Sequence, residues 1–188
     1  MALPFFPKRR KNSPSASPNP LEKLSDRPSA LVKPDLVRIS RILTEEDVLI
    51  APPGIGKKEL IELLVRRLCD RRGFKSPELL LAKVIEREQG ISTTLDTGLS
   101  LPHARLDDIE DLVAAMAVVP QEIADAQAGG LVIRLMFLFF SSSRPAMLPR
   151  HLQLLRRIAS LFDPGLIGRV GAAPSPAAAW EIIRQTEG

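Results

Sequence analysis

The sequence has little of what several common classes of protein require. Its 188 residues include one cysteine, two histidines and no tyrosine. One cysteine excludes an internal disulfide framework, and Cys69 lies in an apolar helical stretch where a buried thiol is expected. No apolar run approaches the roughly 18 residues that span a bilayer, and the N-terminal residues lack the charge order of a secretory signal. We therefore expect a cytoplasmic protein without a transmembrane segment.

The net charge of +4 is unevenly distributed along the chain. Residues 1–41 contain nine Lys and Arg against three Asp and Glu, whereas residues 42–188 contain 17 against 19. The basic character therefore belongs to the N-terminal segment, and the rest of the chain lacks the positive charge typical of a nucleic-acid-binding protein. We expect no nucleic acid among the partners.

Residues 1–37 contain seven of the 17 prolines, with Ser, Asn, Lys and Arg between them. This composition cannot bury enough apolar surface to offset chain entropy, so it predicts a disordered, basic, Pro-rich tail. The run KRRK at residues 8–11 could contact anionic lipid, RNA or a protein partner, although a solubilising tail is the favoured interpretation. A globular domain is expected over residues 38–188.

Helical and strand-like patterns alternate in the globular part. Residues 57–72 carry apolar side chains at helical spacing and end at Gly73, and residues 77–89 lie between a possible N-cap, Ser76, and Gly90. The other predicted elements are a short opening element and strand (36–51), a hairpin (92–102), strands (112–120 and 131–140) around a turn-rich stretch (121–130), and helices (148–162, 164–171 and 177–185). Because strands and helices are interspersed, we predict one α/β domain with a mixed β-sheet flanked by helices.

Two features that could indicate a cofactor do not have the required pattern. The segment PPGIGKK at residues 52–58 lacks the G-x-x-x-x-G-K-[ST] spacing of a nucleotide-binding loop, and no Ser or Thr follows its lysines. The two histidines have no nearby cysteine or set of acidic ligands, so they would make a poor zinc site. We therefore predict neither a cofactor nor a metal.

His103 follows Pro102 at the end of the predicted hairpin. Proline forces Leu101 into an extended conformation and cannot donate to a β-ladder, so the strand is predicted to end there. A residue just beyond a strand is held by the sheet yet open to solvent, and a neutral imidazole is available as a nucleophile near neutral pH. His151 begins an apolar helical stripe, and it could be an ordinary helix-terminal residue.

Taken in order, these segments resemble a known family. A helix ending in Arg87-Glu88 is followed by Ser92-Thr93, Gly98 and Pro102-His103-Ala104-Arg105, and residues 151–162 follow the pattern HLxLLxxIAxLL with Phe162 in the last apolar position. The chain from about residue 38 to residue 186 is similar to the IIA domain of the fructose/mannitol class of bacterial phosphoenolpyruvate-dependent sugar phosphotransferase systems, including the nitrogen-related IIA proteins.

This resemblance implies a phosphoryl relay. His103 would be the phosphorylated nucleophile, accepting a phosphoryl group from the phosphohistidine of the carrier HPr and passing it to a IIB domain or holding it as a regulatory signal. Arg87 would stabilise the phosphoryl charge, and His151 would orient His103 or donate a ring N–H. Ser92 and Thr93 would add phosphate-binding donors. Since the donor is already a high-energy phosphohistidine, such a relay requires neither ATP nor magnesium.

The predicted hairpin departs from the pattern of the family. Thr94, Leu95 and Asp96 stand where the family has Gly-Ile-Gly, and Ile91 stands where a glycine usually precedes Ser-Thr. An Asp96 carboxylate that faced His103 would disfavour phosphohistidine, whereas one that faced solvent would be harmless.

A shallow apolar patch around His103 is expected to receive HPr. Candidates for this patch, each of which could equally belong to the core, are Leu95, Leu99, Leu101 and Met147 or Leu148. Two other interpretations stay open. The chain could be a non-catalytic regulatory binding module with a IIA fold that controls a kinase, a transporter or a transcription factor. The basic tail could also attach the protein to a membrane or to nucleic acid.

Overall fold

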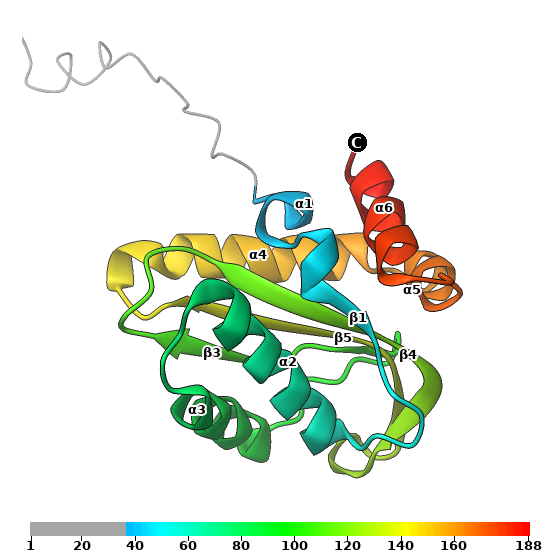
Figure 1. The fold of residues 1–188 in the computed structure, drawn as a ribbon, viewed down its shortest axis with the longest axis horizontal. Helices are drawn as coiled ribbons and strands as arrows, with labels where there is room; N and C mark the ends of the chain where they lie inside the picture. Colours follow the sequence, from blue (N-terminus) through cyan, green and yellow to red (C-terminus); the bar gives the residue numbers. More distant parts are fainter. Residues whose placement is uncertain (1–36) are drawn as a thin grey trace, which may run out of the picture. The chain divides into compact units, whose positions relative to one another are not determined.

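A mixed five-stranded sheet is the central layer of residues 37–188, the part of the chain that the computed structural model describes (Figure 1). The strand order is β1-β4-β5-β2, and β3 pairs with β5 as β2 does. β4 and β5 are antiparallel, and the other pairs are parallel. The strands are β1 (Val48–Ile50), β2 (Leu99–Ser100), β3 (His103–Leu106), β4 (Val113–Asp125) and β5 (Leu131–Ser142). The predicted tail lies outside the described residues, apart from Val37, which is buried.

Helices cover both faces of this sheet (Figure 1). On one face lie α2 (Lys57–Arg72) and α3 (Pro77–Gly90). On the other lie α1 (Ile39–Ile42), α4 (Leu148–Leu161), α5 (Pro164–Gly171) and α6 (Pro176–Glu187). Short 3₁₀ turns precede β1 (Glu45–Asp47), follow β4 (Ala126–Ala128) and precede α4 (Pro145–Met147). The predicted α/β domain with a mixed sheet flanked by helices is confirmed for residues 37–188, where no helix has the length and apolar character needed to cross a membrane.

The predicted helices agree closely with the structure. α2 spans residues 57–72 as predicted and ends at Gly73, whose φ of 73° lies in the left-handed region that favours glycine. Ser76 stands at the N-cap position of α3, but its side chain makes no capping hydrogen bond. These predictions succeed because the apolar spacing marks the face of each helix that packs on the sheet.

Alternate residues of the strands belong to two separate cores. Met116 and Phe137 pack in the core on the α4 side, whereas their neighbours Ala117 and Leu138 pack in the core on the α2 side. Successive side chains of a strand point to opposite faces, so a strand that is covered on both faces is apolar throughout. This arrangement explains the continuous apolar run at residues 135–140.

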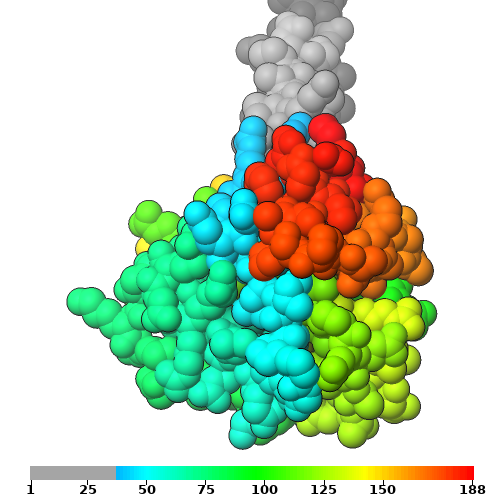
Figure 2. All heavy atoms as spheres, turned by 45° about the vertical axis from the view of Figure 1, so that its right-hand side comes forward, coloured from blue at the N-terminus to red at the C-terminus, as the bar shows by residue number. Residues whose placement is uncertain are grey.

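The two ends of the described chain are bound to each other. The Glu187 carboxylate accepts hydrogen bonds from the backbone N–H groups of Ile39 and Ser40, both at 2.7 Å. Trp180 Nε1 donates to the Leu43 carbonyl at 3.0 Å. Figure 2 shows α6, in red, packed beside the blue segment that contains α1. The C-terminal helix thereby holds the opening element, which has too few residues to form a stable helix alone.

The prediction of a turn-rich stretch over residues 121–130 is wrong for its first half. β4 continues to Asp125, and its last residues pair with the start of β5. The register shifts between Val118 and Ile123, so a bulge accommodates the exposed polar residues between them. The turn itself is formed by residues 126–130, and it ends with two glycines of positive φ.

A strand does end before Pro102, as predicted, but the prediction that His103 itself lies outside a strand is wrong. β2 ends at Ser100, and a new strand, β3, begins at His103. Pro102 cannot donate a hydrogen bond, but its carbonyl accepts one from the Phe139 N–H at 3.2 Å. Pairing with β5 then resumes with His103 opposite Phe139. The backbone of His103 is therefore part of the sheet.

Candidate functional site

An open pocket lies beside β3, at the edge of the sheet. β3 runs between α3 and α4 (Figure 1). Its volume is about 520 Å³. The predicted residues His103, His151 and Arg87 all line this pocket, and they come from β3, α4 and α3. The other lining residues are Lys83, Glu86, Ala104 and Arg105. The structure therefore brings together three candidate residues that are distant in sequence.

The His103 ring is held on two sides. It stacks on Phe139 with a centroid distance of 4.9 Å and an interplanar angle of 4°. Its Nδ1 lies 2.8 Å from the Leu101 carbonyl oxygen. Since a carbonyl oxygen only accepts hydrogen bonds, Nδ1 carries the proton of the neutral ring, and Nε2 keeps its lone pair. The geometry thus selects Nε2 as the nucleophilic atom.

The environment of His103 also favours the neutral ring. Burial lowers the pKa of His103, and the Arg87 guanidinium lowers it further, while the Leu101 hydrogen bond and the Glu88 carboxylate oppose this shift. A lowered pKa keeps most of the His103 population unprotonated on Nε2 at neutral pH. A nucleophilic form of the ring is therefore the resting form.

His151 is the second imidazole of the pocket, and only 7% of its surface is exposed. Its ring centroid lies 5.6 Å from that of His103, and its Nδ1 lies 2.8 Å from Ser141 Oγ. Burial lowers the pKa of His151, and the charges of His103 and Arg105 lower it further. Within residues 37–188, no three His, Cys, Asp or Glu side chains are grouped so as to hold a metal ion.

Three cationic side chains and one carboxylate surround the two rings. Arg87 is exposed near the C-terminal end of α3, and it donates to the Ile91 carbonyl at 3.1 Å. The Arg105 guanidinium donates to the Ser142 carbonyl at 3.1 and 3.3 Å, which fixes it beside the pocket. The excess of positive charge suits an anion with a charge near −2, such as a phosphoryl group on histidine.

Sequence reasoning assigned no role to Arg105. In a strand, residues i and i+2 share one face, so Arg105 lies on the same face of β3 as His103. This signal was present in the sequence Pro102-His103-Ala104-Arg105. Because the sequence predicts that His103 follows a strand rather than begins one, it does not place Arg105 on a shared strand face with His103.

Ser92 and Thr93 do not line this pocket. Ser92 Oγ donates to Asp125 Oδ2 at 2.6 Å and accepts from Lys57 Nζ at 3.0 Å. Thr93 Oγ1 donates to Glu88 Oε1 at 2.5 Å. Both hydroxyls belong to a separate set of polar side chains, named here the Lys57 cluster, which consists of Lys57, Glu88, Ser92, Thr93, Thr94 and Asp125.

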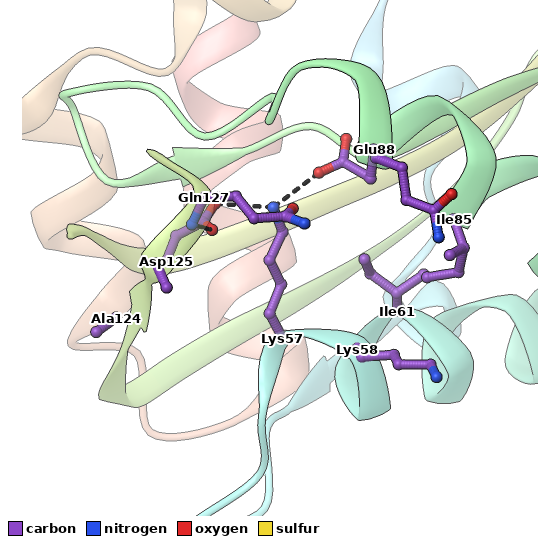
Figure 3. Close-up of a pocket in the computed structure, with 10 residues that line it drawn as sticks. Lys57, Lys58, Ile61, Ile85, Glu88, Ala124, Asp125 and Gln127 are labelled. Atoms are coloured by element: carbon purple, nitrogen blue, oxygen red, sulfur yellow. Dashed lines mark hydrogen bonds and ion pairs between the residues drawn. The ribbon is translucent and has the colours of Figure 1, made fainter. Parts of the chain in front are cut away.

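Lys57 is the centre of the Lys57 cluster (Figure 3). Its Nζ lies 2.7 Å from Glu88 Oε2 and 2.8 Å from Asp125 Oδ2. Burial would raise the pKa of Asp125, but hydrogen bonds from Lys57, Ser92 and Thr94 hold it well below its usual range. The cluster joins the start of α2, the end of α3, the hairpin and the end of β4. It thereby positions the end of α3, which carries Arg87, against the hairpin that leads to His103.

Thr94 and Asp96, which the family resemblance aligns with glycines, have defined positions in the hairpin. Thr94 is buried, and its hydroxyl donates to Asp125 Oδ2 at 2.6 Å. Its backbone forms a bridge with Ser100 across the predicted hairpin. Asp96 is exposed at the hairpin turn, and it is not among the charges that shift the pKa of His103. The repulsion that an inward-facing Asp96 would cause is therefore absent.

The apolar candidates around His103 divide into two groups. Leu99 and Leu101 are buried in the core on the α4 side. Leu95 and Leu148 are exposed, and so is Leu152, the residue after His151. The exposed leucines of the hairpin and of α4 thus remain available for a partner.

Comparisons with known sequences point to one family. A family model described as "Phosphoenolpyruvate-dependent sugar phosphotransferase system, EIIA 2" matches residues 41–186. A nitrogen regulatory protein of Pseudomonas aeruginosa is 25% identical over 149 residues, covering 79% of this chain and 96% of that protein. The Escherichia coli protein of the same name is 26% identical over 154 residues, covering 81% and 93%.

Solved structures have the same fold. The crystal structure of nitrogen regulatory protein IIA-Ntr from Neisseria meningitidis matches with a TM-score of 0.68 at 22% identity, covering 77% of this chain and 98% of that chain. The complex of enzyme IIAMtl with phosphorylated enzyme IIBMtl from Escherichia coli matches with a TM-score of 0.63 at 17% identity, covering 76% and 97%. Since the family model spans nearly all of the described residues, the chain belongs to the EIIA 2 family of the phosphoenolpyruvate-dependent sugar phosphotransferase system.

Proposed function

We propose that this protein is a phosphohistidine carrier of the phosphotransferase system and that His103 takes up and releases the phosphoryl group. One observation carries the proposal. The Leu101 carbonyl accepts a hydrogen bond from Nδ1 of His103, so the lone pair of the neutral ring is on Nε2. His151, Arg87 and Arg105 line the same pocket. A neutral nucleophile, a possible ring N–H donor and fixed positive charge are the groups that phosphoryl transfer between imidazoles requires.

In the transfer, the lone pair of His103 Nε2 attacks the phosphorus of the donor's phosphohistidine. The N–P bond of the donor breaks, and its electron pair stays on the donor's ring nitrogen, so no proton has to move. The proton on His103 Nδ1 stays in its hydrogen bond to Leu101, which stabilises the positive charge of the phosphorylated ring. Arg87 and Arg105 offset the charge on the three equatorial oxygens. The reverse sequence delivers the group to the acceptor.

The phosphoryl donor is an HPr-like carrier, and the acceptor is a IIB domain or a regulatory target protein. The mannitol IIA, which shares this fold, is in complex with phosphorylated IIB in its structure. In this chain, the exposed Leu148 and Leu152, which flank His151 on α4, provide apolar contact area near the pocket for such partners. Any sugar specificity would come from the partners, and the relay would operate in the cytoplasm.

Phosphorylation by a reconstituted relay tests the proposal. The protein should gain the mass of one phosphate when it is incubated with phosphoenolpyruvate, enzyme I and HPr. His103→Ala should gain none, whereas Lys58→Ala, on the exposed side of α2 and outside the pocket, should react like the wild type. Phosphate that still attaches to the His103→Ala protein would overturn the assignment.

A regulatory binding module is the second candidate function. The names of the relatives favour it, because the similar proteins of Pseudomonas aeruginosa and Escherichia coli are nitrogen regulatory proteins. The protein would then control a kinase, a transporter or a transcription factor by binding it. Pull-downs with the wild type and with His103→Asp discriminate the two functions. Equal binding by both, together with no phosphorylation in cells, would favour a binding module that does not use phosphorylation.

A further inference from the structure

Two residues on one face of β5 each hold one imidazole of the pocket. Phe139 stacks on His103, and Ser141, two residues later, lies with its Oγ 2.8 Å from His151 Nδ1. The register places Ser141 opposite Arg105 of β3. Ser141 is only 1% exposed, so water does not compete with His151 for its hydroxyl. The contact between Ser141 and His151 is therefore a buried hydrogen bond whose atoms take no part in the bond changes of phosphoryl transfer.

The direction of this hydrogen bond follows from the hydroxyl proton. A serine hydroxyl has one proton to donate and two lone pairs. Among residues 37–188, His151 Nδ1 is the only hydrogen-bond partner of Ser141 Oγ. If Nδ1 donated, the hydroxyl proton would be buried without an acceptor, which costs free energy, whereas an unused lone pair on the oxygen costs less. The hydroxyl therefore donates, Nδ1 accepts, and neutral His151 carries its proton on Nε2.

We propose that Ser141 is a positioning residue of the phosphoryl relay. Its hydroxyl fixes both the orientation of the His151 ring and its tautomer, so that Nε2–H donates to the phosphoryl group on His103. The inference rests on the proposed function. A His151 ring with the proton on Nδ1 would present the lone pair of Nε2 to phosphoryl oxygens, which would repel it. With the proton on Nε2, the same ring donates a hydrogen bond to the group that carries the negative charge.

The tautomer of His151 can be measured in the wild-type protein without any substitution. Long-range proton–nitrogen NMR of the full chain, labelled with ¹⁵N in histidine, should show His151 protonated on Nε2 and His103 protonated on Nδ1. In Ser141→Ala, the His151 Nδ1 resonance should move toward that of an imidazole nitrogen without a hydrogen bond. Ser100→Ala is the matched control, because Ser100 is equally buried and lies on β2, outside the pocket. A wild-type His151 that carries its proton on Nδ1 would overturn the proposal.

The rate of phosphorylation tests the role of the contact in the relay. Phosphoramidate, a small donor with an N–P bond, removes the contribution of protein docking. Loss of a hydrogen-bond donor to the transition state lowers the rate about 10²–10³-fold. Ser141→Ala keeps the donor, His151, and only loosens the orientation of its ring. We therefore expect Ser141→Ala to react about tenfold more slowly than the wild type, whereas Ser100→Ala should react at the rate of the wild type. Thermal melting should show that the two alanine variants are equally folded.

The outcomes separate this inference from the proposed function. Equal rates for Ser141→Ala and Ser100→Ala, with His103 phosphorylated in both, would refute the role of Ser141 and leave the carrier function intact. No phosphorylation of wild-type His103 by phosphoramidate or by HPr would refute the carrier function itself. A tenfold loss confined to Ser141→Ala, together with the shifted Nδ1 resonance, would support both.

Discussion

Replacement of Lys57 by methionine tests the buried charge cluster that supports the pocket. The substitution keeps the length of the side chain and removes its charge, so the carboxylates of Glu88 and Asp125 lose their common cation while 5% and 2% of their side chains remain exposed. Removal of one partner from a buried ion pair costs about 3–5 kcal/mol. Because Ser92 and Thr94 still donate to Asp125, we expect the lower end of this range.

Urea unfolding gives the free energy directly. Trp180, the only tryptophan in the sequence, provides the fluorescence signal. Lys58→Met is the matched control, since the neighbouring Lys58 is exposed and lies outside the Lys57 cluster, and it should change the free energy of unfolding by less than about 0.5 kcal/mol. A free energy of unfolding of Lys57→Met that lies within about 1 kcal/mol of that of Lys58→Met would contradict the role assigned to the Lys57 cluster.

The loss of stability in Lys57→Met should also depend on pH. In the folded protein the pKa of Asp125 is lowered, so its contribution to stability is present above the unfolded pKa of about 3.9 and is lost as the pH falls below that value. Without Lys57 the pKa of Asp125 is lowered less. The difference between variant and wild type should therefore be largest at neutral pH and shrink in acid. A difference that does not shrink by the lowest pH at which the wild type stays folded would contradict this reasoning.

Three further predictions concern the pocket and the hairpin. Arg105→Met should slow phosphorylation of His103 by HPr about tenfold or more because it removes a fixed cation, while Arg134→Met, outside the pocket, should leave the rate unchanged. At pH about 6.5, the ordinary pKa of histidine, the rate should stay above half of its alkaline value, because the pKa of His103 is lowered; a rate at or below half would contradict this. Thr94→Gly should lower the free energy of unfolding by about 1–2 kcal/mol in urea, since the charged hydrogen bond to Asp125 is lost; a stabilised variant would contradict it.

The helices could be predicted from the sequence because burial repeats along them with the helical period. In α2, Leu60, Leu64 and Leu68 fall on one buried face. The end of β4 could not be predicted in this way, because its polar residues look like a turn. Only the pairing of residues 123–125 with residues 131–133 of β5 continues the strand there, and pairing between separate segments leaves little trace in local periodicity.

The pocket and the Lys57 cluster differ in how visible they are in the sequence. Arg87, His103 and His151 belong to ordered motifs, so a resemblance to a family could group them. Lys57 and Asp125 are 68 positions apart, and nothing near either residue indicates the other. Two features of the sequence are explained together. Lys57, in the segment PPGIGKK, and Thr94, which the family resemblance aligns with a glycine, both bind Asp125.

The two imidazoles are chemically identical, yet their Nδ1 atoms meet groups of opposite character. Nδ1 of His103 lies beside a carbonyl oxygen, which accepts a hydrogen bond. Nδ1 of His151 lies beside a hydroxyl, whose proton has no other acceptor among residues 37–188. The rings are therefore fixed in opposite tautomers, with a lone pair on Nε2 of His103 and a proton on Nε2 of His151. The first assignment depends on a backbone atom, which no substitution at Leu101 removes. The second depends on one side-chain hydroxyl, so the division of roles between nucleophile and donor is most vulnerable at Ser141.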